Sequence, residues 1–298
     1  MPTDASRPAV PAAEAAAEGA GVVRLPALAM LGTGSMNGAV LGGLLQPGVE
    51  VDGDVRVTTR SAASAAALGS REGVAAASVE EDADANRRAV RGARIVVVGV
   101  KPHMVPDLLR EVADDLEPGA LVISVAAGVT VATFESLLPA HVAVVRSMPN
   151  TPSLVGRGVT GLAAGTRSTA DDLALARSVF ATVGDVVEVP EDRIDALSTI
   201  SGSGPAYVFL LVEELTRTAE AKGFSPEEAR VLVQGTFRGA VELLAASDDE
   251  PAELRRRVTS PKGTTERAVE VLQAADLSGL FDRATDAALA RARELAAG

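Results

Sequence analysis

Residues 25–38 carry the sequence LPALAMLGTGSMNG, and this stretch decides the fold. A short apolar run enters a glycine turn, and apolar residues resume over 39–45, which predicts a strand, a tight turn and a helix. At the start of a βαβ unit, the N–H groups of such a turn bind a pyrophosphate at the positive end of the helix. The motif alone also fits any tight turn, and Asn37 stands at its third glycine position. The predicted nucleotide contacts are Gly32, Gly34, Ser35 and Met36.

The same alternation continues through the first half of the chain. Short β-branched runs predict further strands, and helical periods lie between them, so we expect an α/β fold with a Rossmann-type doubly wound sheet over 25–190. The predicted strands lie at 55–59, 95–100, 121–125, 142–145, 160–164 and 186–189. The predicted helices lie at 61–68, 104–116, 131–138 and 170–183.

After Pro190 only helical periods remain, so 191–298 is predicted to be an all-α C-terminal domain. The expected helices cover 206–222, 226–246, 251–258, 263–275 and 280–295. Residues 206–212 are apolar on nearly every side, and further broad apolar stripes follow at 231–233 and 241–244. A solvated bundle of this size does not need so much apolar surface, and we therefore expect helix-to-helix dimerisation.

The composition excludes several functions. The 298 residues include no Cys and two His, so we expect no disulfide, metal site or catalytic cysteine. A net charge of −12 and 2% aromatic residues argue against nucleic-acid binding. The apolar runs are much shorter than the ~20 residues of a membrane span, so no membrane segment is expected. Residues 1–24, rich in Ala and Pro, are predicted to be a disordered tail on a cytoplasmic protein, because they lack the features of a secretion signal.

The end of the second predicted strand indicates which cofactor binds. An acidic residue there would hold the ribose hydroxyls of NAD, whereas this strand ends in Arg60 and Ser61, which suit a 2′-phosphate. Asp52 and Asp54 precede the strand and therefore lie at its other end. The alternative for Arg60 is an ordinary surface arginine. We predict NADPH as the cofactor, with NADH as the second choice.

Two further loops follow predicted strands and are expected to face the ligand. Lys101 and Pro102 come after the strand that ends at 100, where the carboxyl edge of an α/β sheet binds ligands, although a plain helix start also explains them. Asn150 lies in the loop MPNTP, whose prolines fix the backbone beside a short amide side chain. We predict all three as cofactor contacts. For Asn150 two alternatives stay open, a position facing the substrate and an ordinary turn.

Two helix starts in the second domain combine small residues with hydroxyl groups: SGSGPAY at 201–207 and SPKGTT at 260–265. Free N–H groups and the positive end of a helix dipole bind carboxylates, although capping alone explains each start. Together they indicate a small anionic substrate.

These elements occur in the order and spacing of one family. GTGSM, Val100–Lys101–Pro102, SVAAG, RSMPNTP, SGSGPAY and SPKGTT resemble the pyrroline-5-carboxylate reductases over essentially the whole chain from Leu25. The resemblance implies NAD(P)H-dependent hydride transfer to the cyclic imine 1-pyrroline-5-carboxylate, which gives L-proline in the last step of proline biosynthesis. It also implies a homodimer or larger homo-oligomer that is built through the helical domain.

The resemblance assigns roles in the SPKGTT element. It implies that Ser260, Gly263 and Thr264 bind the substrate carboxylate and that Thr265 is the catalytic hydroxyl near the ring nitrogen. Lys262 departs from the family pattern, which has glycine there. Two alternatives stay open: a β-hydroxyacid dehydrogenase, whose interdomain lysine is absent from 201–207, and a non-catalytic NADP(H) sensor. Turnover would distinguish the enzyme from the sensor.

Overall fold

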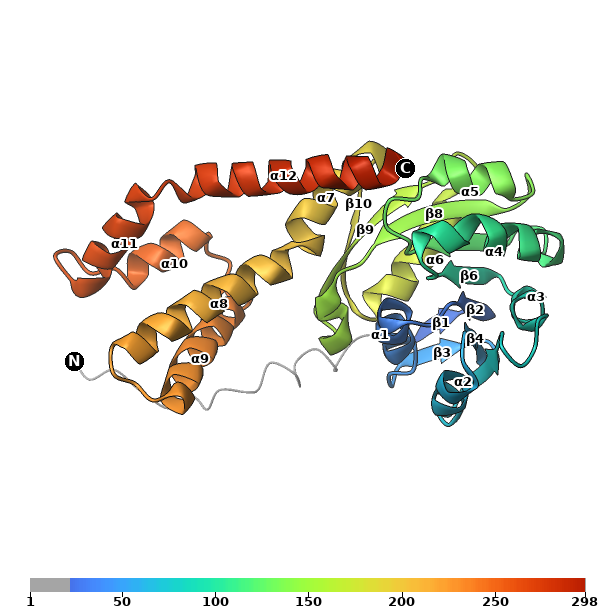
Figure 1. The fold of residues 1–298 in the computed structure, drawn as a ribbon, viewed down its shortest axis with the longest axis horizontal. Helices are drawn as coiled ribbons and strands as arrows, with labels where there is room; N and C mark the ends of the chain where they lie inside the picture. The colour runs from blue at the N-terminus through green and yellow to red at the C-terminus, as the bar shows by residue number, and fades with distance from the viewer. Residues whose placement is uncertain (1–21, 298) are drawn as a thin grey trace. The chain divides into compact units, whose positions relative to one another are not determined.

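A computed structural model describes residues 22–297 (Figure 1). The chain divides into two compact units, 1–194 and 195–298, and each is described by itself. The predicted tail, 1–24, lies outside the described residues except for 22–24. Val23 and Arg24, which the prediction placed in this tail, belong to the strand β1 (Val23–Leu25).

The first unit is built on an eight-stranded sheet in the order β10-β9-β8-β7-β6-β2-β4-β5. Neighbouring strands are parallel except β8 and β9, which pair antiparallel. The strand order reverses between β2 and β6, and in such sheets the crevice at this switch point binds ligands. The strands are β2 (Leu28–Leu31), β4 (Val55–Thr59), β5 (Val74–Ser78), β6 (Ile95–Val98), β7 (Leu121–Ser124), β8 (Ala143–Met148), β9 (Gly158–Ala164) and β10 (Gly184–Glu188).

Helices cover both faces of this sheet (Figure 1). Side chains of β2 alternate between two cores: Leu28 and Met30 pack with α1 and α6, whereas Ala29 and Leu31 pack with α3, α4 and α5. Burial on both faces explains the unbroken apolar strands. The helices are α1 (Ser35–Leu44), α2 (Ala62–Gly69), α3 (Ala85–Val90), α4 (Val105–Val112), α5 (Val131–Leu137) and α6 (Ala170–Ala181).

The predicted doubly wound architecture is confirmed, with several elements added. The structure adds strands β1 (Val23–Leu25), β3 (Val49–Val51) and β5, and helix α3. Strand β5 has the sequence VAAAS, and alanine has little intrinsic preference for strands, so its pairing with β4 stabilises it. Strand β9 was predicted at 160–164, but its antiparallel pairing with β8 was not, because an apolar pattern carries no strand direction.

The capping box of α6 holds a buried carboxylate. Asp172 accepts hydrogen bonds from the backbone N–H of Thr169 (2.9 Å), from the Thr169 hydroxyl (2.8 Å) and from Arg94 Nη2 (2.6 Å). Burial raises the pKa of Asp172, but the bonds from Thr169 and Arg94 outweigh it, and the net pKa lies below the usual value. The carboxylate is therefore ionised at neutral pH in the folded unit.

We expect Asp172→Asn to lower the free energy of unfolding by about 3 kcal/mol, because Arg94 is left without its charged partner. The native pKa is the lower one, so this contribution is present above about pH 4 and disappears as the pH falls through the native pKa. Urea titrations at neutral and acidic pH measure the effect. Asp171→Asn, on the exposed side of the same helical turn, is the control. Equal destabilisation by both variants would contradict the assignment.

The second unit is helical, as predicted. A π-helical turn (Ser198–Gly202) follows α7 (Ile194–Leu197), whose first residue closes the first unit. The remaining helices are α8 (Gly204–Ala221), α9 (Pro226–Ala245), α10 (Pro251–Arg257), α11 (Thr264–Ala274) and α12 (Leu277–Ala297). No helix in the described part of the chain is both long and apolar enough to span a bilayer.

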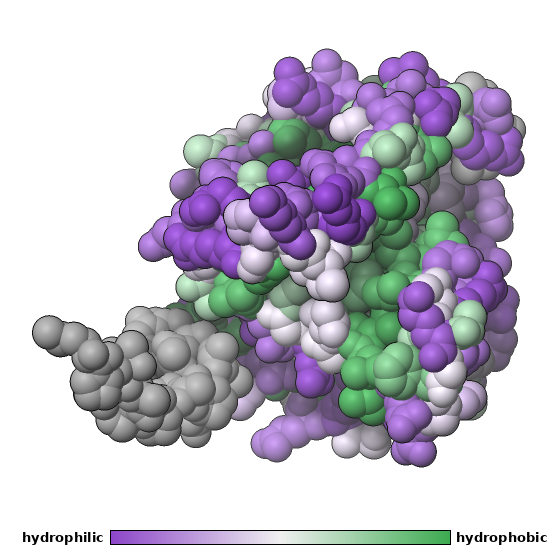
Figure 2. All heavy atoms as spheres, turned by 90° about the vertical axis from the view of Figure 1, so that its left-hand side faces the viewer, coloured by the Kyte–Doolittle hydropathy of each residue, from purple (hydrophilic) through white to green (hydrophobic). Residues whose placement is uncertain are grey.

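This helical unit exposes much of its apolar surface. Among residues 195–294, whose side chains are described, only Thr199, Ala229 and Val233 are buried. Large hydrophobic side chains lie open instead (Figure 2), including Phe209, at 67% exposure, and Val271, at 72%. Monomeric proteins seldom leave so much apolar area in water. Apolar surfaces of this size are typical of interfaces between protein chains.

Candidate functional site

A cavity of about 550 Å³ lies at the carboxyl ends of β2, β4 and β6, beside the switch point of the sheet. Its lining includes five of the predicted nucleotide contacts: Gly32, Gly34, Arg60, Ser61 and Lys101. The other four, Ser35, Met36, Pro102 and Asn150, are not among its lining residues. Ser35 and Met36 open helix α1 directly after the turn. These assignments stay predictions.

Close packing and a left-handed backbone explain why the first residue of the turn, Gly32, is a glycine. Gly32 has φ of +74°, and a Cβ there would lie 2.5 Å from Val100 Cγ1 and 3.0 Å from the Val100 nitrogen. Its N–H donates to Thr58 Oγ1 (3.3 Å), a contact that sequence analysis missed. At Gly34, in contrast, a Cβ would meet nothing within 4 Å. The backbone at Gly34 is therefore open at the start of α1, as a pyrophosphate cradle requires.

The third glycine of the usual motif is replaced by a pair of residues. The Asn37 side chain is 1% exposed and donates from Nδ2 to the carbonyls of Leu31 and Gly32, both at 3.4 Å. A Cβ at Gly99 would lie 2.3 Å from that Nδ2 atom. The space that the motif usually gains from a glycine in the helix comes here from Gly99, at the end of β6. Gly99 lies inside the strand predicted at 95–100 and was not assigned a role, although a glycine at the end of a buried strand was a usable signal.

The two residues that favour NADPH lie at the start of α2. The Ser61 hydroxyl caps this helix by accepting from the Ser64 N–H (3.3 Å), and the Arg60 side chain is exposed beside it. The Arg60 carbonyl accepts from the Ser78 hydroxyl (3.0 Å), which fixes the backbone between β4 and β5. A guanidinium, a hydroxyl and a helix N-terminus at one corner of the cavity suit a phosphate group.

We expect Arg60→Asp to raise the KM for NADPH at least about 10-fold while leaving the KM for NADH within about 2-fold, because only NADPH carries the 2′-phosphate. Initial rates with each cofactor measure the effect. The control is Arg71→Asp, an exposed arginine beyond the far end of α2 and outside the cavity lining. Equal changes for both cofactors in the Arg60 variant would refute the assignment.

Lys101 and Asn150 have different surroundings. Lys101 is exposed, lines the cavity and precedes the short helix Pro102–Met104. Asn150 is 7% exposed, and its Oδ1 accepts from the Val159 N–H at 2.8 Å. That bond fixes the MPNTP loop against β9. It fits one alternative given for Asn150, an ordinary structural turn, better than a cofactor contact.

The loop 258–263 joins α10 to α11, and the SPKGTT element, 260–265, covers the end of this loop and the first two residues of α11. Gly263 donates its N–H to the Ser260 carbonyl (2.9 Å), and a Cβ on Gly263 would lie 2.9 Å from that same oxygen. Lys262 has φ of +61°, which lies in the left-handed region that glycine occupies most easily. This backbone conformation explains why the family pattern has a glycine at this position. The Lys262 N–H donates to Glu266 Oε2 (2.8 Å), a loop contact that sequence analysis missed.

The predicted substrate hydroxyls begin helix α11. Thr264 and Thr265 occupy its first two positions and are exposed. Within residues 22–297 neither hydroxyl has a hydrogen-bond partner. They therefore lie beside the unpaired N–H groups of a helix N-terminus, an arrangement that favours an anionic group.

The other predicted anion site, SGSGPAY, has a different structure. Ser201 lies inside the π-helical turn Ser198–Gly202, and α8 begins at Gly204 without a side-chain cap. The Tyr207 hydroxyl donates to the Thr199 carbonyl at 2.9 Å, which braces this turn. The segment is thus a distorted helical turn rather than the plain helix start that we expected. π-Helical turns of this kind are frequent at functional sites.

The fold and the cavity define a class: dinucleotide-binding proteins of the Rossmann type with a helical second domain. Residues 191–295 match the family profile described as pyrroline-5-carboxylate reductase dimerisation. Residues 27–128 match the profile described as NADP oxidoreductase, coenzyme F420-dependent.

Relatives identify the family. The pyrroline-5-carboxylate reductase of Pseudomonas aeruginosa is 38% identical over 272 residues, covering 91% of this chain and 97% of its own length. The solved pyrroline-5-carboxylate reductase of Coxiella burnetii is similar with a TM-score of 0.82 at 38% identity, covering 90% of this chain and 97% of that one. The Plasmodium falciparum pyrroline carboxylate reductase, solved with NADP bound, gives 0.74 at 25% identity, with 91% and 98% covered. The chain belongs to the pyrroline-5-carboxylate reductase family.

Proposed function

We propose that the chain reduces 1-pyrroline-5-carboxylate to L-proline with NADPH. The observation that carries this is the combination of the cavity at the carboxyl edge of the sheet in the first unit with the SPKGTT element in the second, within a chain 38% identical to a pyrroline-5-carboxylate reductase over 91% of its length. The open backbone at Gly34 and the cation at Arg60 fit the two phosphate-bearing parts of NADPH. When bound, NADPH supplies the hydride equivalent that reduces the imine carbon.

The substrate carboxylate is proposed to bind at the N-terminus of α11. The Ser260 hydroxyl and the Thr264 N–H group supply donors there, Gly263 closes the turn between them through its bond to the Ser260 carbonyl, and the helix dipole adds positive charge. Thr265 follows one residue later, and its unpartnered hydroxyl is proposed to hydrogen-bond the ring nitrogen. The imine nitrogen needs one proton as its carbon is reduced, and this chemistry requires neither a nucleophile nor a metal.

The first test is the loss of NADPH absorbance when purified protein is mixed with 1-pyrroline-5-carboxylate, repeated with NADH. Rapid oxidation that depends on the substrate is the expected result, with NADPH giving the lower KM. Binding of NADPH without oxidation would leave the nucleotide site intact and overturn the enzymatic function. In that case Lys262→Gly is the first reversion to examine, because it restores the family residue in the 258–263 loop.

We also propose that the functional form is a homodimer or a larger homo-oligomer. The dimerisation profile over 191–295 and the open hydrophobic side chains of α8, α9 and α11 support this. Light scattering at micromolar concentration should give at least twice the chain mass of 30.3 kDa. A monomer under these conditions would contradict it. The cytoplasmic location and the lack of nucleic-acid partners stay predictions from the sequence.

A further inference from the structure

Helix α10 leads directly into the 258–263 loop and has little apolar packing to hold it. Its seven residues, Pro251–Arg257, include no buried side chain. Isolated helices shorter than about 12 residues are marginal in water. Within this chain, only the half-buried Leu254 gives α10 apolar packing, so polar contacts carry much of what holds the helix in place.

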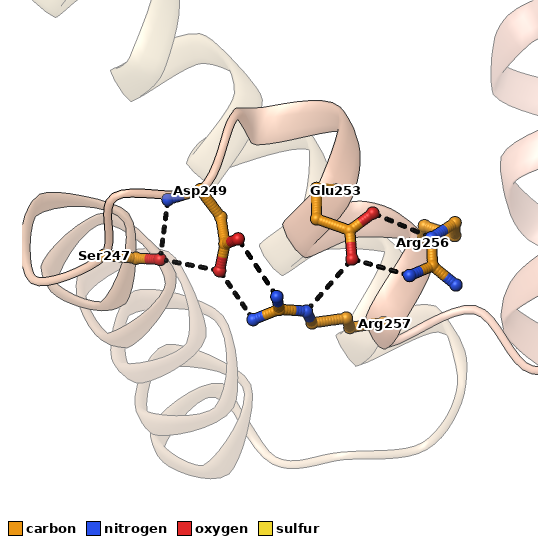
Figure 3. Close-up of polar contacts among 5 residues, drawn as sticks. All are labelled: Ser247, Asp249, Glu253, Arg256 and Arg257. Carbon is orange, nitrogen blue, oxygen red and sulfur yellow. Dashed lines mark hydrogen bonds and ion pairs between the residues drawn. The ribbon is translucent and has the colours of Figure 1, made fainter.

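Figure 3 shows the contacts that meet this need. Arg257 reaches back to Asp249, before the helix, through two contacts of 2.5 and 3.0 Å, and donates from Nε to Glu253 at 3.1 Å. Glu253 also accepts from Arg256 at 2.6 and 2.8 Å. The Ser247 hydroxyl donates to Asp249 at 3.0 Å, which ties the end of α9 to the same group. This connected set is the α10 charge network.

The network differs from an ordinary surface ion pair. Single exposed pairs contribute little to stability. Here one planar guanidinium joins two carboxylates that are only 30% and 32% exposed, and it links the loop before α10 to the last residue of that helix. Hydrogen bonding from Arg256 holds the pKa of Glu253 below its usual value, so its carboxylate stays ionised at neutral pH. Two-pronged arginine contacts add geometric specificity as well as energy.

Backbone contacts carry this position forward along the chain. The Thr259 N–H donates to the Arg256 carbonyl (3.1 Å), and the Thr259 hydroxyl donates to the Arg255 carbonyl (2.6 Å). Ser260 follows, and its carbonyl accepts the Gly263 N–H at the start of α11. The α10 charge network therefore fixes the C-terminal end of α10 and, through Thr259, the position of Ser260, the first residue of the predicted carboxylate site.

We propose that the α10 charge network, centred on Arg257 and Glu253, positions the 258–263 loop for the carboxylate of the substrate without touching that substrate. The proposal rests on the proposed function, because it concerns the same binding loop. Arg257 and Glu253 are then positioning residues. Their loss leaves the binding groups present but displaced, and displacements of about 1 Å have large kinetic effects.

The test measures the steady-state kinetics of Arg257→Gln and Glu253→Gln. Each variant should show a KM for 1-pyrroline-5-carboxylate about 10-fold higher, with kcat and the KM for NADPH within about 2-fold of the unmodified protein. The double variant Asp249→Asn/Arg257→Gln should have the same KM for 1-pyrroline-5-carboxylate as Arg257→Gln alone, because both substitutions remove the same Asp249–Arg257 ion pair. Arg257→Lys keeps the positive charge but cannot make the two-pronged guanidinium contact, so its KM for 1-pyrroline-5-carboxylate should lie between those of the unmodified protein and Arg257→Gln.

The matched control is Glu270→Gln, which removes another exposed pair, with Arg267 at 2.9 Å, from α11 beyond the two threonines. This variant should have the same KM for 1-pyrroline-5-carboxylate as the unmodified protein. The proposal is overturned if the network variants keep that KM too. It is also overturned if they lower kcat, NADPH affinity and melting temperature together, since that pattern indicates general destabilisation. If the unmodified protein shows no turnover at all, the proposed function fails instead.

Discussion

Replacing Gly32 by alanine should weaken NADPH binding about 100-fold, a change of nearly 3 kcal/mol in binding free energy. The φ of +74° is unfavourable for any residue with a Cβ, and that atom would lie 2.5 Å from Val100 Cγ1. The turn must shift to relieve the contact, and the N–H groups of the cradle shift with it. Fluorescence titration with NADPH measures the dissociation constant.

The matched control for this variant lies in the same helix–turn segment. Gly42→Ala places a Cβ on helix α1 with nothing within 4 Å, at a residue outside the cavity lining. It should bind NADPH normally and fold slightly more stably, because alanine favours helix over glycine. If Gly32→Ala also binds NADPH normally, the glycine turn is not the nucleotide site.

Replacing Thr265 by alanine should lower kcat about 100-fold with little change in NADPH affinity. Its hydroxyl is exposed at the start of α11 and has no partner in the described part of the chain, so it is free to bond the ring nitrogen. Steady-state kinetics and NADPH titration separate the two effects. Thr265→Ser, which keeps the hydroxyl, should retain most of the turnover.

Two results would contradict this role for Thr265. Unchanged turnover in Thr265→Ala would show that the hydroxyl is dispensable. A loss of turnover that Thr265→Ser does not recover would point to the methyl group, and so to packing.

The sequence predicted the first unit well because its signals are local. Apolar strands buried on both faces, such as β6 (IVVV), give unbroken runs, and the glycine turn of β2–α1 has a distinctive spacing. The cofactor contacts that it predicts there include Gly32 and Arg60, which directly follow such strands and line the cavity. Position at a strand end is therefore what sequence reasoning captured.

The contacts that were missed depend on residues far apart in the chain. The Thr58 hydroxyl accepts from the Gly32 N–H across 26 positions in the sequence. Gly99, which follows β6, leaves the space that the Asn37 side chain of helix α1 occupies. Neither relation leaves a periodic pattern in the sequence. In the second unit, the π-helical turn 198–202 was missed because its sequence fits a regular helix start, and the strain at Lys262 shows only in its φ angle.

The most direct test of the central claim follows one atom. The protein is incubated with 1-pyrroline-5-carboxylate and NADPH that carries deuterium at the transferable position of its nicotinamide, and the product is analysed by mass spectrometry. We expect L-proline with one deuterium on the former imine carbon. Proline without deuterium, or no proline despite NADPH binding, would contradict it.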